Sequence, residues 1–217
     1  MKKKISTVFL STPEAEAGAM PSVYPRPQLV RDSFLSLDGK WEFCAIPKGF
    51  EPVFDRLITV PFPPESPLSR IGEVFPDGTE LNYRRSFTLP DGFHRGRVLL
   101  HFGAADQVAE IWLNSHFLGK HEGGYLPFSF DITAHLRPGQ NDLFVRVTDD
   151  LGSHVLPWGK QKHKRGGMWY TPVSGLWQSV WLESVPEVYI KSLSIQADST
   201  GAVIRADGIS EGMIKVH

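Results

Sequence analysis

The sequence predicts an all-β protein built as a two-sheet sandwich. Across its 217 residues, short apolar runs alternate with the period of two that strands show, and almost none repeats with the helical period of 3.6. The 20 glycines and 17 prolines fall between these runs, where they mark turns. Eight or more short strands separated by turns are typical of a sandwich with jelly-roll connections.

The first elements are predicted from proline positions and from alternation. Residues 1–36 carry several prolines and are expected to form an irregular lead-in. A turn and strand follow at 37–43, with Trp41 and Phe43 on one face, and a short strand is expected at 57–61. That second strand ends in a proline-rich loop, because proline cannot donate a hydrogen bond to a sheet.

The strongest strand pattern lies in residues 81–148, which are expected to supply most of the sandwich. Asn114 and Ser115 are predicted to form a two-residue hairpin turn between two of its strands. Later strands are expected at 168–170 and 177–182, and two more at 189–195 and 202–206. Within the central block, the predicted strands are 83–89, 97–102, 108–113, 117–120, 127–131 and 143–147.

Three of the six tryptophans, Trp169, Trp177 and Trp181, lie on either side of a bend. If 177–182 is one strand, Trp177 and Trp181 share a face. Both faces of that strand are largely apolar, which favours packing over an open sugar platform. Trp169 and Tyr170 precede the bend beside two glycines, and they are the better candidates for a ligand-facing edge.

Composition argues against several classes of partner. The formal net charge is −1, so bulk charge indicates neither a nucleic acid nor a membrane surface as partner. The apolar run near the N-terminus is shorter than the roughly 7–15 residues of a signal peptide, and no run approaches the ~20 residues of a membrane span. The single cysteine, Cys44, is expected to be a small buried hydrophobe. The single cysteine and the short apolar run predict a cytoplasmic protein, with export as the alternative.

No metal or cofactor site is predicted. The eight histidines show no ligand spacing on a common element, and there is no Cys/His cluster. No glycine-rich phosphate loop precedes a helix. Of the adjacent arginines Arg84 and Arg85, one is expected to pair with a buried carboxylate such as Asp131.

An ordered set of short motifs resembles the N-terminal sugar-binding domain of glycoside hydrolase family 2, which contains β-galactosidases, β-glucuronidases and β-mannosidases. The resemblance covers roughly residues 24–183, and each motif is weak alone but the ordered set is specific. The motifs are YPRPQ at 24–28, LDGKWEF at 37–43, VPFPPES at 60–66, NYRRSF at 82–87, LLHF at 99–102, AEIWLN at 109–114, HEGGYLPF at 121–128, FDIT at 130–133 and GLWQSVWL at 175–182.

The resemblance implies a domain organisation. Residues 37–184 would form a galactose-binding-like jelly roll, packed beside a catalytic TIM barrel. Residues 188–217 would be the opening strands of an immunoglobulin-like domain. A TIM barrel needs roughly 250 residues, more than the whole chain has. The chain also lacks the βα alternation and the Asn-Glu dipeptide that carries the acid/base in this family. We therefore predict no catalytic residue in this chain.

Two loops are predicted to approach a sugar. Residues 149–167 form a long, basic loop that would lean over the barrel's active site; its candidate contacts are Trp158, His163 and Arg165. In the β-galactosidase branch an aspartate just before the Met-Trp pair touches the sugar, but Gly167 occupies that place here. The nearby cations would instead suit an acidic sugar such as a uronate.

The second loop is Pro-Glu-Ser-Pro at 64–67. Glu65 and Ser66 match positions that reach sugar hydroxyls in the family. With Trp158, His163, Arg165, Trp169 and Tyr170, they complete the set of candidate substrate-binding residues. For each of these loops the alternative is an ordinary solvated surface loop.

The sequence thus predicts a non-catalytic sugar-binding and scaffold domain of a retaining β-glycosidase, with loops at the rim of the active site. Its expected partners are a β-glycoside and the TIM-barrel and immunoglobulin-like domains of a parent chain. Two alternatives stay open. The chain could be a stand-alone carbohydrate-binding module, or a purely structural module that packs between domains.

Overall fold

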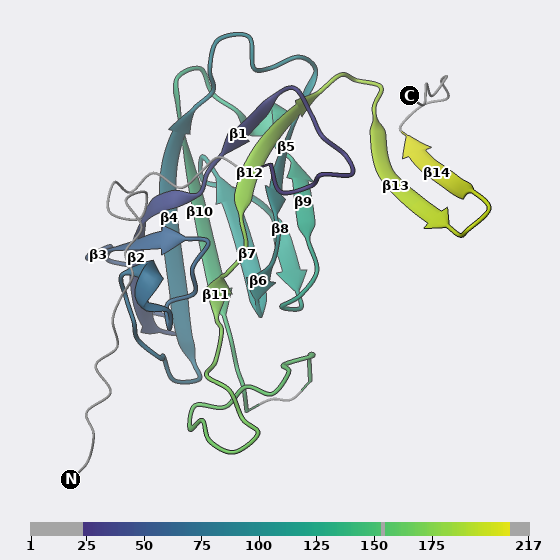
Figure 1. The fold of residues 1–217 in the computed structure, drawn as a ribbon. Helices are drawn as coiled ribbons and strands as arrows, with labels where there is room; N and C mark the ends of the chain where they lie inside the picture. The colour runs from purple at the N-terminus through teal and green to yellow at the C-terminus, as the bar shows by residue number, and fades with distance from the viewer. Residues whose placement is uncertain (1–23, 153–154, 209–217) are drawn as a thin grey trace.

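A computed structural model of the chain describes residues 24–152 and 155–208 (Figure 1). Two antiparallel sheets pack face to face and confirm the predicted all-β sandwich. The smaller sheet has the order β1 (Phe34–Ser36), β12 (Val180–Val185), β5 (Arg97–Phe102), β9 (Phe128–Asp131). The larger sheet has the order β3 (Arg56–Val60), β2 (Gly39–Pro47), β4 (Thr79–Thr88), β10 (Gln140–Thr148), β7 (Val108–Leu113), β8 (His116–Glu122).

Shorter elements complete the described chain. A two-stranded sheet joins β6 (Ala105–Asp106) to β11 (Gly175–Leu176). Two short 3-10 helices, η1 (Pro67–Ser69) and η2 (Thr133–His135), lie in connections. None of the helices in the described ranges has the length and apolar character needed to cross a bilayer.

The core lies between the two large sheets and follows the predicted alternation. In β2, Trp41 and Phe43 are buried as predicted. In β10, Leu143, Val145 and Val147 point inward, while the residues between them face outward. Cys44 is also buried, as predicted.

The predicted hairpin turn at Asn114 and Ser115 is confirmed. Both residues have positive φ, 51° and 70°, as a two-residue turn between twisted strands requires. The buried Asn114 side chain also links this turn to β10: its Oδ1 accepts from the backbone N–H of Asp142 at 3.0 Å, and its Nδ2 donates to Asn141 Oδ1 at 2.8 Å.

The predicted strands at 168–170 and 177–182 are wrong in detail. Residues 168–170 make only isolated bridges, and β12 begins at Val180. Between β11 and β12 the chain crosses from the two-stranded sheet of β6 and β11 to the four-stranded sheet. Trp177 and Trp181 therefore do not share a strand face. Packing nevertheless explains both side chains. Trp181 is buried and stacks on His101 at 5.0 Å, and Trp177 donates to the Gly124 carbonyl at 2.9 Å.

The predicted pairing of Arg84 or Arg85 with Asp131 is also wrong. Arg84 faces outward and binds Glu42 through two hydrogen bonds of 2.6 and 3.0 Å. Arg85 donates to the Lys40 carbonyl. Asp131 pairs instead with Arg97 at 3.0 Å. Neighbouring strands decided these partners, since β2 and β5 bring Glu42 and Arg97 beside β4 and β9.

A buried carboxylate ties the N-terminal segment to the sandwich. Glu183 in β12 has a fully buried side chain. Arg26 binds both of its oxygens, at 2.7 and 2.5 Å, and the Tyr24 hydroxyl donates to Oε1 at 2.5 Å. On the same carboxylate, Trp181 donates at 2.9 Å and Arg31 lies 3.7 Å away.

The titration of this cluster follows from its contacts. Burial alone would raise the pKa of Glu183, but the His101 ring 3.3 Å away and the hydrogen bonds from Tyr24 and Trp181 outweigh burial and hold that pKa well below its usual range. Burial lowers the pKa of His101 despite the nearby carboxylate. Glu183 is therefore ionised and His101 neutral near pH 7.

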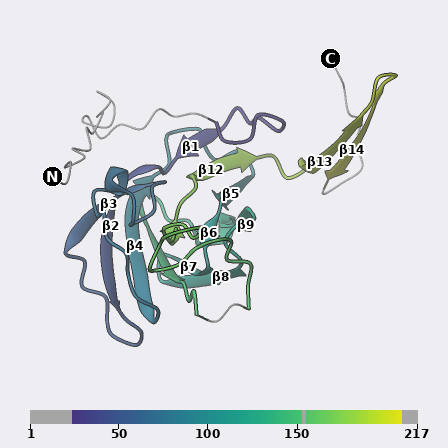
Figure 2. The same ribbon diagram turned by 60° about the horizontal axis from the view of Figure 1, so that its bottom comes forward.

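The final hairpin, β13 (Ile190–Ala197) and β14 (Ala202–Gly208), forms its own two-stranded sheet. In both views it lies to one side of the sandwich (Figure 1, Figure 2). Arg31 reaches it, donating to the Ile190 carbonyl, with its guanidinium 5.7 Å from the centre of the Tyr189 ring. Two strands alone are marginal in water, and these contacts with Arg31 add to the pairing of the hairpin.

Replacing Glu183 with Gln should lower the free energy of unfolding by about 3–5 kcal/mol, because it removes the fully buried negative charge that pairs with the half-buried Arg26 and Arg31. The matched control is Glu187→Gln, which removes the exposed partner of Arg97 and should cost about 0–1 kcal/mol. Urea unfolding followed by circular dichroism would measure both. Equal losses for the two variants would contradict the role assigned to Glu183.

Candidate functional site

The loop between β10 and β11 projects beyond the strands at one end of the sandwich (Figure 1, lower part; Figure 2, front). The described part of this loop is ordered by its own backbone. Tyr170 N–H donates to the Lys160 carbonyl at 2.7 Å, and Lys162 N–H donates to the Tyr170 carbonyl at 3.0 Å. Gly166 and Trp169 exchange backbone hydrogen bonds of 3.1 and 3.2 Å across a tight turn. Gly167 in that turn has φ 57°, a backbone conformation that favours glycine.

Two of the predicted tryptophans meet in this loop. The rings of Trp158 and Trp169 stack with centroids 5.8 Å apart and planes 13° from parallel. Lys162 places its ammonium group 4.0 Å from the centre of the Trp169 ring. We call these three residues the aromatic platform. Both rings are half-buried, so each keeps surface accessible to a ligand.

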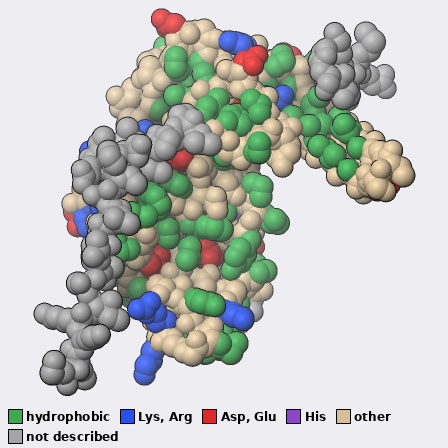
Figure 3. Space-filling view, viewed as in Figure 1, with side chains coloured by type: hydrophobic (Ala, Val, Ile, Leu, Met, Phe, Trp, Pro, Cys, Tyr) green, Lys and Arg blue, Asp and Glu red, His purple; other side chains and the backbone are tan. Residues whose placement is uncertain are grey.

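Exposed side chains surround the aromatic platform. Tyr170 is 66% exposed and Met168 58% exposed, unusually high for residues of their size. Arg165 is exposed beside the turn. Lys and Arg side chains are visible at this end of the molecule (Figure 3). The end therefore combines aromatic faces with exposed cations.

Behind the loop lie three carboxylates, Glu65, Asp106 and Asp149, which we call the buried acidic cluster. Ser174 donates to Glu65 from its hydroxyl at 2.6 Å and its N–H at 3.2 Å, and burial raises the pKa of Glu65. Burial raises the pKa of Asp106 to about 6. Burial, together with repulsion from Asp106 and Glu65, raises the pKa of Asp149 to about 7.

Gln161 connects the loop to this cluster and was not predicted as a site residue. Its Nε2 donates to Asp106 Oδ2 at 3.1 Å, and its Oε1 accepts from the Val173 N–H at 2.5 Å. The side chain is buried although its sequence neighbours are charged. The only sequence signal for Gln161 was an uncharged polar residue inside a basic loop. This signal could not predict that its partner would be Asp106.

The other predicted site residues have structural partners. Glu65 joins its loop to the segment before β11 through Ser174. Ser66 caps η1, since its hydroxyl accepts from the Leu68 N–H at 3.2 Å. His163 lies 2.8 Å from Asp77. Burial acts to raise the pKa of Asp77, but the hydrogen bonds from His163 and the Leu151 N–H outweigh it and lower that pKa.

The predicted residues therefore form no single pocket. The cavity lined by Glu65, Asp77, Asp149, His163 and Ser174 measures ≈ 10 Å³, about the room of one water. A sugar ring does not fit between these acids. Within residues 24–152 and 155–208, no group of three or more His, Cys, Asp or Glu side chains is arranged to hold a metal ion.

Buried acids with raised pKa values oppose folding as they ionise. Asp149 binds its proton more tightly in the folded chain, so its contribution to stability is lost between its ordinary pKa near 3.8 and about 7. Asp149→Asn should raise the free energy of unfolding by about 1–2 kcal/mol at pH 8 and change it little at pH 4. Thermal unfolding at both values of pH would measure this.

The control for Asp149→Asn is Asp91→Asn, which alters an exposed aspartate outside the buried acidic cluster and should not reproduce the gain in stability at pH 8. An Asp149→Asn variant that is no more stable than the parent at pH 8 would contradict the burial and repulsion assigned to Asp149.

Comparison with known proteins identifies a family and several relatives that share this architecture. The family described as "Glycosyl hydrolases family 2, sugar binding domain" matches residues 58–186. A β-glucuronidase of Paenibacillus borealis is 26% identical over 210 residues, covering 82% of this chain and 33% of that protein. A β-galactosidase of Thermoanaerobacter pseudethanolicus is 30% identical over 118 residues, covering 54% of this chain and 15% of that protein.

Solved structures agree. A β-glucuronidase of Bifidobacterium dentium complexed with coumarin-3-O-glucuronide superposes with a TM-score of 0.62 at 26% identity, over 78% of this chain and 33% of that one. A β-glucuronidase of Ruminococcus gnavus in complex with D-glucuronic acid gives a TM-score of 0.63 at 24% identity, over 87% and 36%. The chain thus spans about a third or less of these relatives. The jelly-roll sandwich, the ordered motifs and the family match show that this chain belongs to glycoside hydrolase family 2 and carries its sugar-binding domain.

Proposed function

We propose that this chain acts as the non-catalytic sugar-binding and scaffold domain of a retaining β-glycosidase. In this proposal the loop between β10 and β11 contributes to the rim of an active site carried by a TIM barrel outside this sequence. The relatives are β-glucuronidases and β-galactosidases, and the chain covers only 13–33% of the length of four of them. The acid/base and nucleophile of a retaining mechanism, two carboxylates ~5–5.5 Å apart in an open cleft, would belong to that barrel.

The aromatic platform is the observation that carries the proposal. A pyranose ring presents an apolar C–H face that packs on an aromatic ring, while its hydroxyls seek polar partners. Trp158 and Trp169 supply the rings, and Tyr170 adds an exposed hydroxyl. Contact with a sugar ring would explain why large aromatic side chains occupy a projecting loop.

The cations of the same loop suggest which sugar is favoured. Lys162 lies directly over the Trp169 ring, and Arg165 is exposed nearby. An ammonium beside a stacking surface would pair with a carboxylate on the stacked sugar. Gly167, at the position of the β-galactosidase aspartate, supplies no side chain to a neutral sugar. These features favour a β-linked uronate over galactose.

Residues 188–217 are proposed to begin a second, immunoglobulin-like domain after the jelly roll of 37–184. The support is that, within the described range, β13 and β14 pair only with each other. Strand β1 lies before residue 37, but it pairs with β12 and forms the edge of the four-stranded sheet.

A structural packing module is the second candidate function. Its support is the set of exposed apolar side chains toward the loop end, where Leu126 is 70% exposed and Val155 82% exposed. A surface that packs against another domain would gather such side chains. The two functions are compatible if the aromatic platform binds sugar while neighbouring apolar residues contact the barrel.

A sugar titration tests the proposal. Tryptophan fluorescence of the chain should change saturably with glucuronate at millimolar concentration or below, and less with galactose, glucose or mannose. Lys162→Ala should weaken glucuronate binding about five- to tenfold, because it removes a charge-assisted contact but keeps both rings.

The control is Lys191→Ala, which removes an exposed lysine on β13 and should leave the affinity unchanged. A flat response to all four sugars would contradict sugar binding by this chain and would favour the structural packing module.

A further inference from the structure

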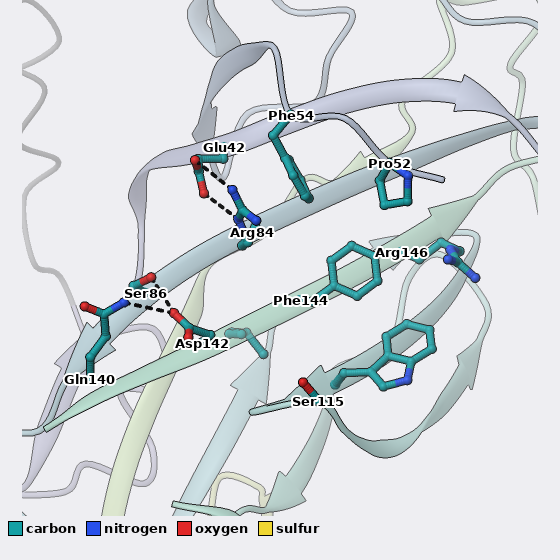
Figure 4. A pocket seen from close by; sticks show the side chains of 12 residues that line it. Glu42, Pro52, Phe54, Arg84, Ser86, Ser115, Gln140, Asp142, Phe144 and Arg146 are labelled. Atoms are coloured by element: carbon teal, nitrogen blue, oxygen red, sulfur yellow. Dashed lines mark hydrogen bonds and ion pairs between the residues drawn. The ribbon is translucent and has the colours of Figure 1, made fainter. Parts of the chain in front are cut away.

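A second surface, which includes no residue of the loop between β10 and β11, combines aromatic and hydrogen-bonding side chains. It is a groove of ≈ 790 Å³ on the outward face of the six-stranded sheet (Figure 4). Alternation along the strands places its residues there. Arg84 and Ser86 in β4, and Asp142 and Phe144 in β10, are the outward neighbours of core residues.

Aromatic rings form a continuous row that lines this groove and ends beside it at Phe117. Phe54, from the loop before β3, contacts Phe144 edge to face with centroids 6.3 Å apart. Phe144 lies 5.2 Å from Trp112 in β7, which lies 5.2 Å from Phe117 in β8. Phe54, Phe144 and Trp112 are half-buried. Neighbouring side chains cover part of each ring, and the rest stays accessible.

Arginines hold two of these rings in place. The Arg84 guanidinium lies 4.3 Å from the centre of the Phe54 ring, and that of Arg146 lies 5.4 Å from the Trp112 ring. Each arginine is in turn positioned by a carboxylate. Arg84 pairs with Glu42, and Arg146 lies 3.4 Å from the buried Glu80. The row is therefore preorganised before a ligand arrives.

The polar lining is balanced in charge. Among the residues that line the groove, two carboxylates, Glu42 and Asp142, accompany two guanidiniums, Arg84 and Arg146. Glu80 and Glu110 beside Arg146 add negative charge, so the groove has no excess of positive charge. Asp142 Oδ1 accepts from Ser86 Oγ at 2.6 Å and from Gln140 Nε2 at 3.1 Å, so its carboxylate is fixed as well (Figure 4). A charge-balanced lining offers no net attraction to a polyanion. It offers acceptors and donors side by side, which matches hydroxyl groups that both donate and accept.

We propose that this groove is a second carbohydrate site, which takes a neutral segment of a glycan chain. It spans four neighbouring strands, β2, β4, β10 and β7. At ~4.8 Å per strand spacing its length is ~14 Å, which suits several linked sugar rings rather than one. Their C–H faces would pack on Trp112, Phe144 and Phe54, and their hydroxyls would bond the flanking acids and arginines. The site is independent of the aromatic platform and would hold a polysaccharide against the domain.

Affinity electrophoresis of the full 217-residue chain tests this site. Gels would contain a soluble mixed-linkage β-glucan, xylan, galactan or polygalacturonate. We expect at least one neutral polysaccharide to retard the chain and polygalacturonate to retard it less. Trp112→Ala and Phe54→Ala should each weaken that retardation about tenfold, a loss of ~1.4 kcal/mol in affinity. Phe54 lies in a loop, so its variant keeps the test valid if Trp112→Ala fails to fold.

Trp169→Ala is the matched control, because it alters the aromatic platform and leaves the groove intact. It should retain full retardation by the neutral polysaccharide while losing the response to glucuronate. Failure of the proposed function would therefore not affect this result. The proposal is overturned if no neutral polysaccharide retards the chain, or if retardation survives both Trp112→Ala and Phe54→Ala. It is also overturned if those substitutions abolish self-association in sedimentation, which would make the groove a protein interface.

Discussion

The rest of the sandwich depends on the pairing of one buried charge. This charge is the ionised Glu183 side chain, which lies on an inner strand of the four-stranded sheet. It lies in β12, between β1 and β5, and two arginines, a tyrosine and a tryptophan converge on it. A carboxylate in such a place is tolerable only with full pairing, because the interior repays desolvation only through close opposite charge and hydrogen bonds. Arg26 and Tyr24 satisfy it, so residues 24–33, the described part of the chain before β1, are attached to the sandwich. Arg31 extends the same cluster toward Tyr189 beside the final hairpin.

Much of this architecture could be predicted from the sequence, because period-two alternation reports directly which face of a strand is buried. Trp41 and Phe43 followed that rule, and the Asn114–Ser115 turn followed from residue types that tolerate positive φ. Prediction failed where the chain leaves that periodicity. Trp177 precedes β12 because the chain changes sheets there, and no local pattern announces such a crossing. Long-range partners were equally hidden, since Glu183 is 157 residues from Arg26.

The candidate site shows the same division. Local composition identified the aromatic and basic loop, and the structure brings Trp158 and Trp169 together within it. The buried acidic cluster required tertiary structure, because Glu65 and Asp149 come from different loops and meet only in the fold. The sequence analysis did not predict the groove across β4 and β10, because its aromatic and charged residues come from separate strands that only the fold brings together. Two surfaces of different chemistry thus emerge, one cationic and projecting, the other charge-balanced and preorganised.

The most direct measurement is a two-dimensional NMR titration of the six tryptophan indole N–H signals with methyl β-glucuronide. The six indoles sample distinct environments, from the fully buried Trp41 to the half-buried rings of the loop. If the projecting loop recognises the sugar, the signals of Trp158 and Trp169 shift saturably, while those of Trp41 and Trp181 stay in place. Shifts confined to other tryptophans, or no shift up to high millimolar sugar, would contradict a carbohydrate-binding role for this loop.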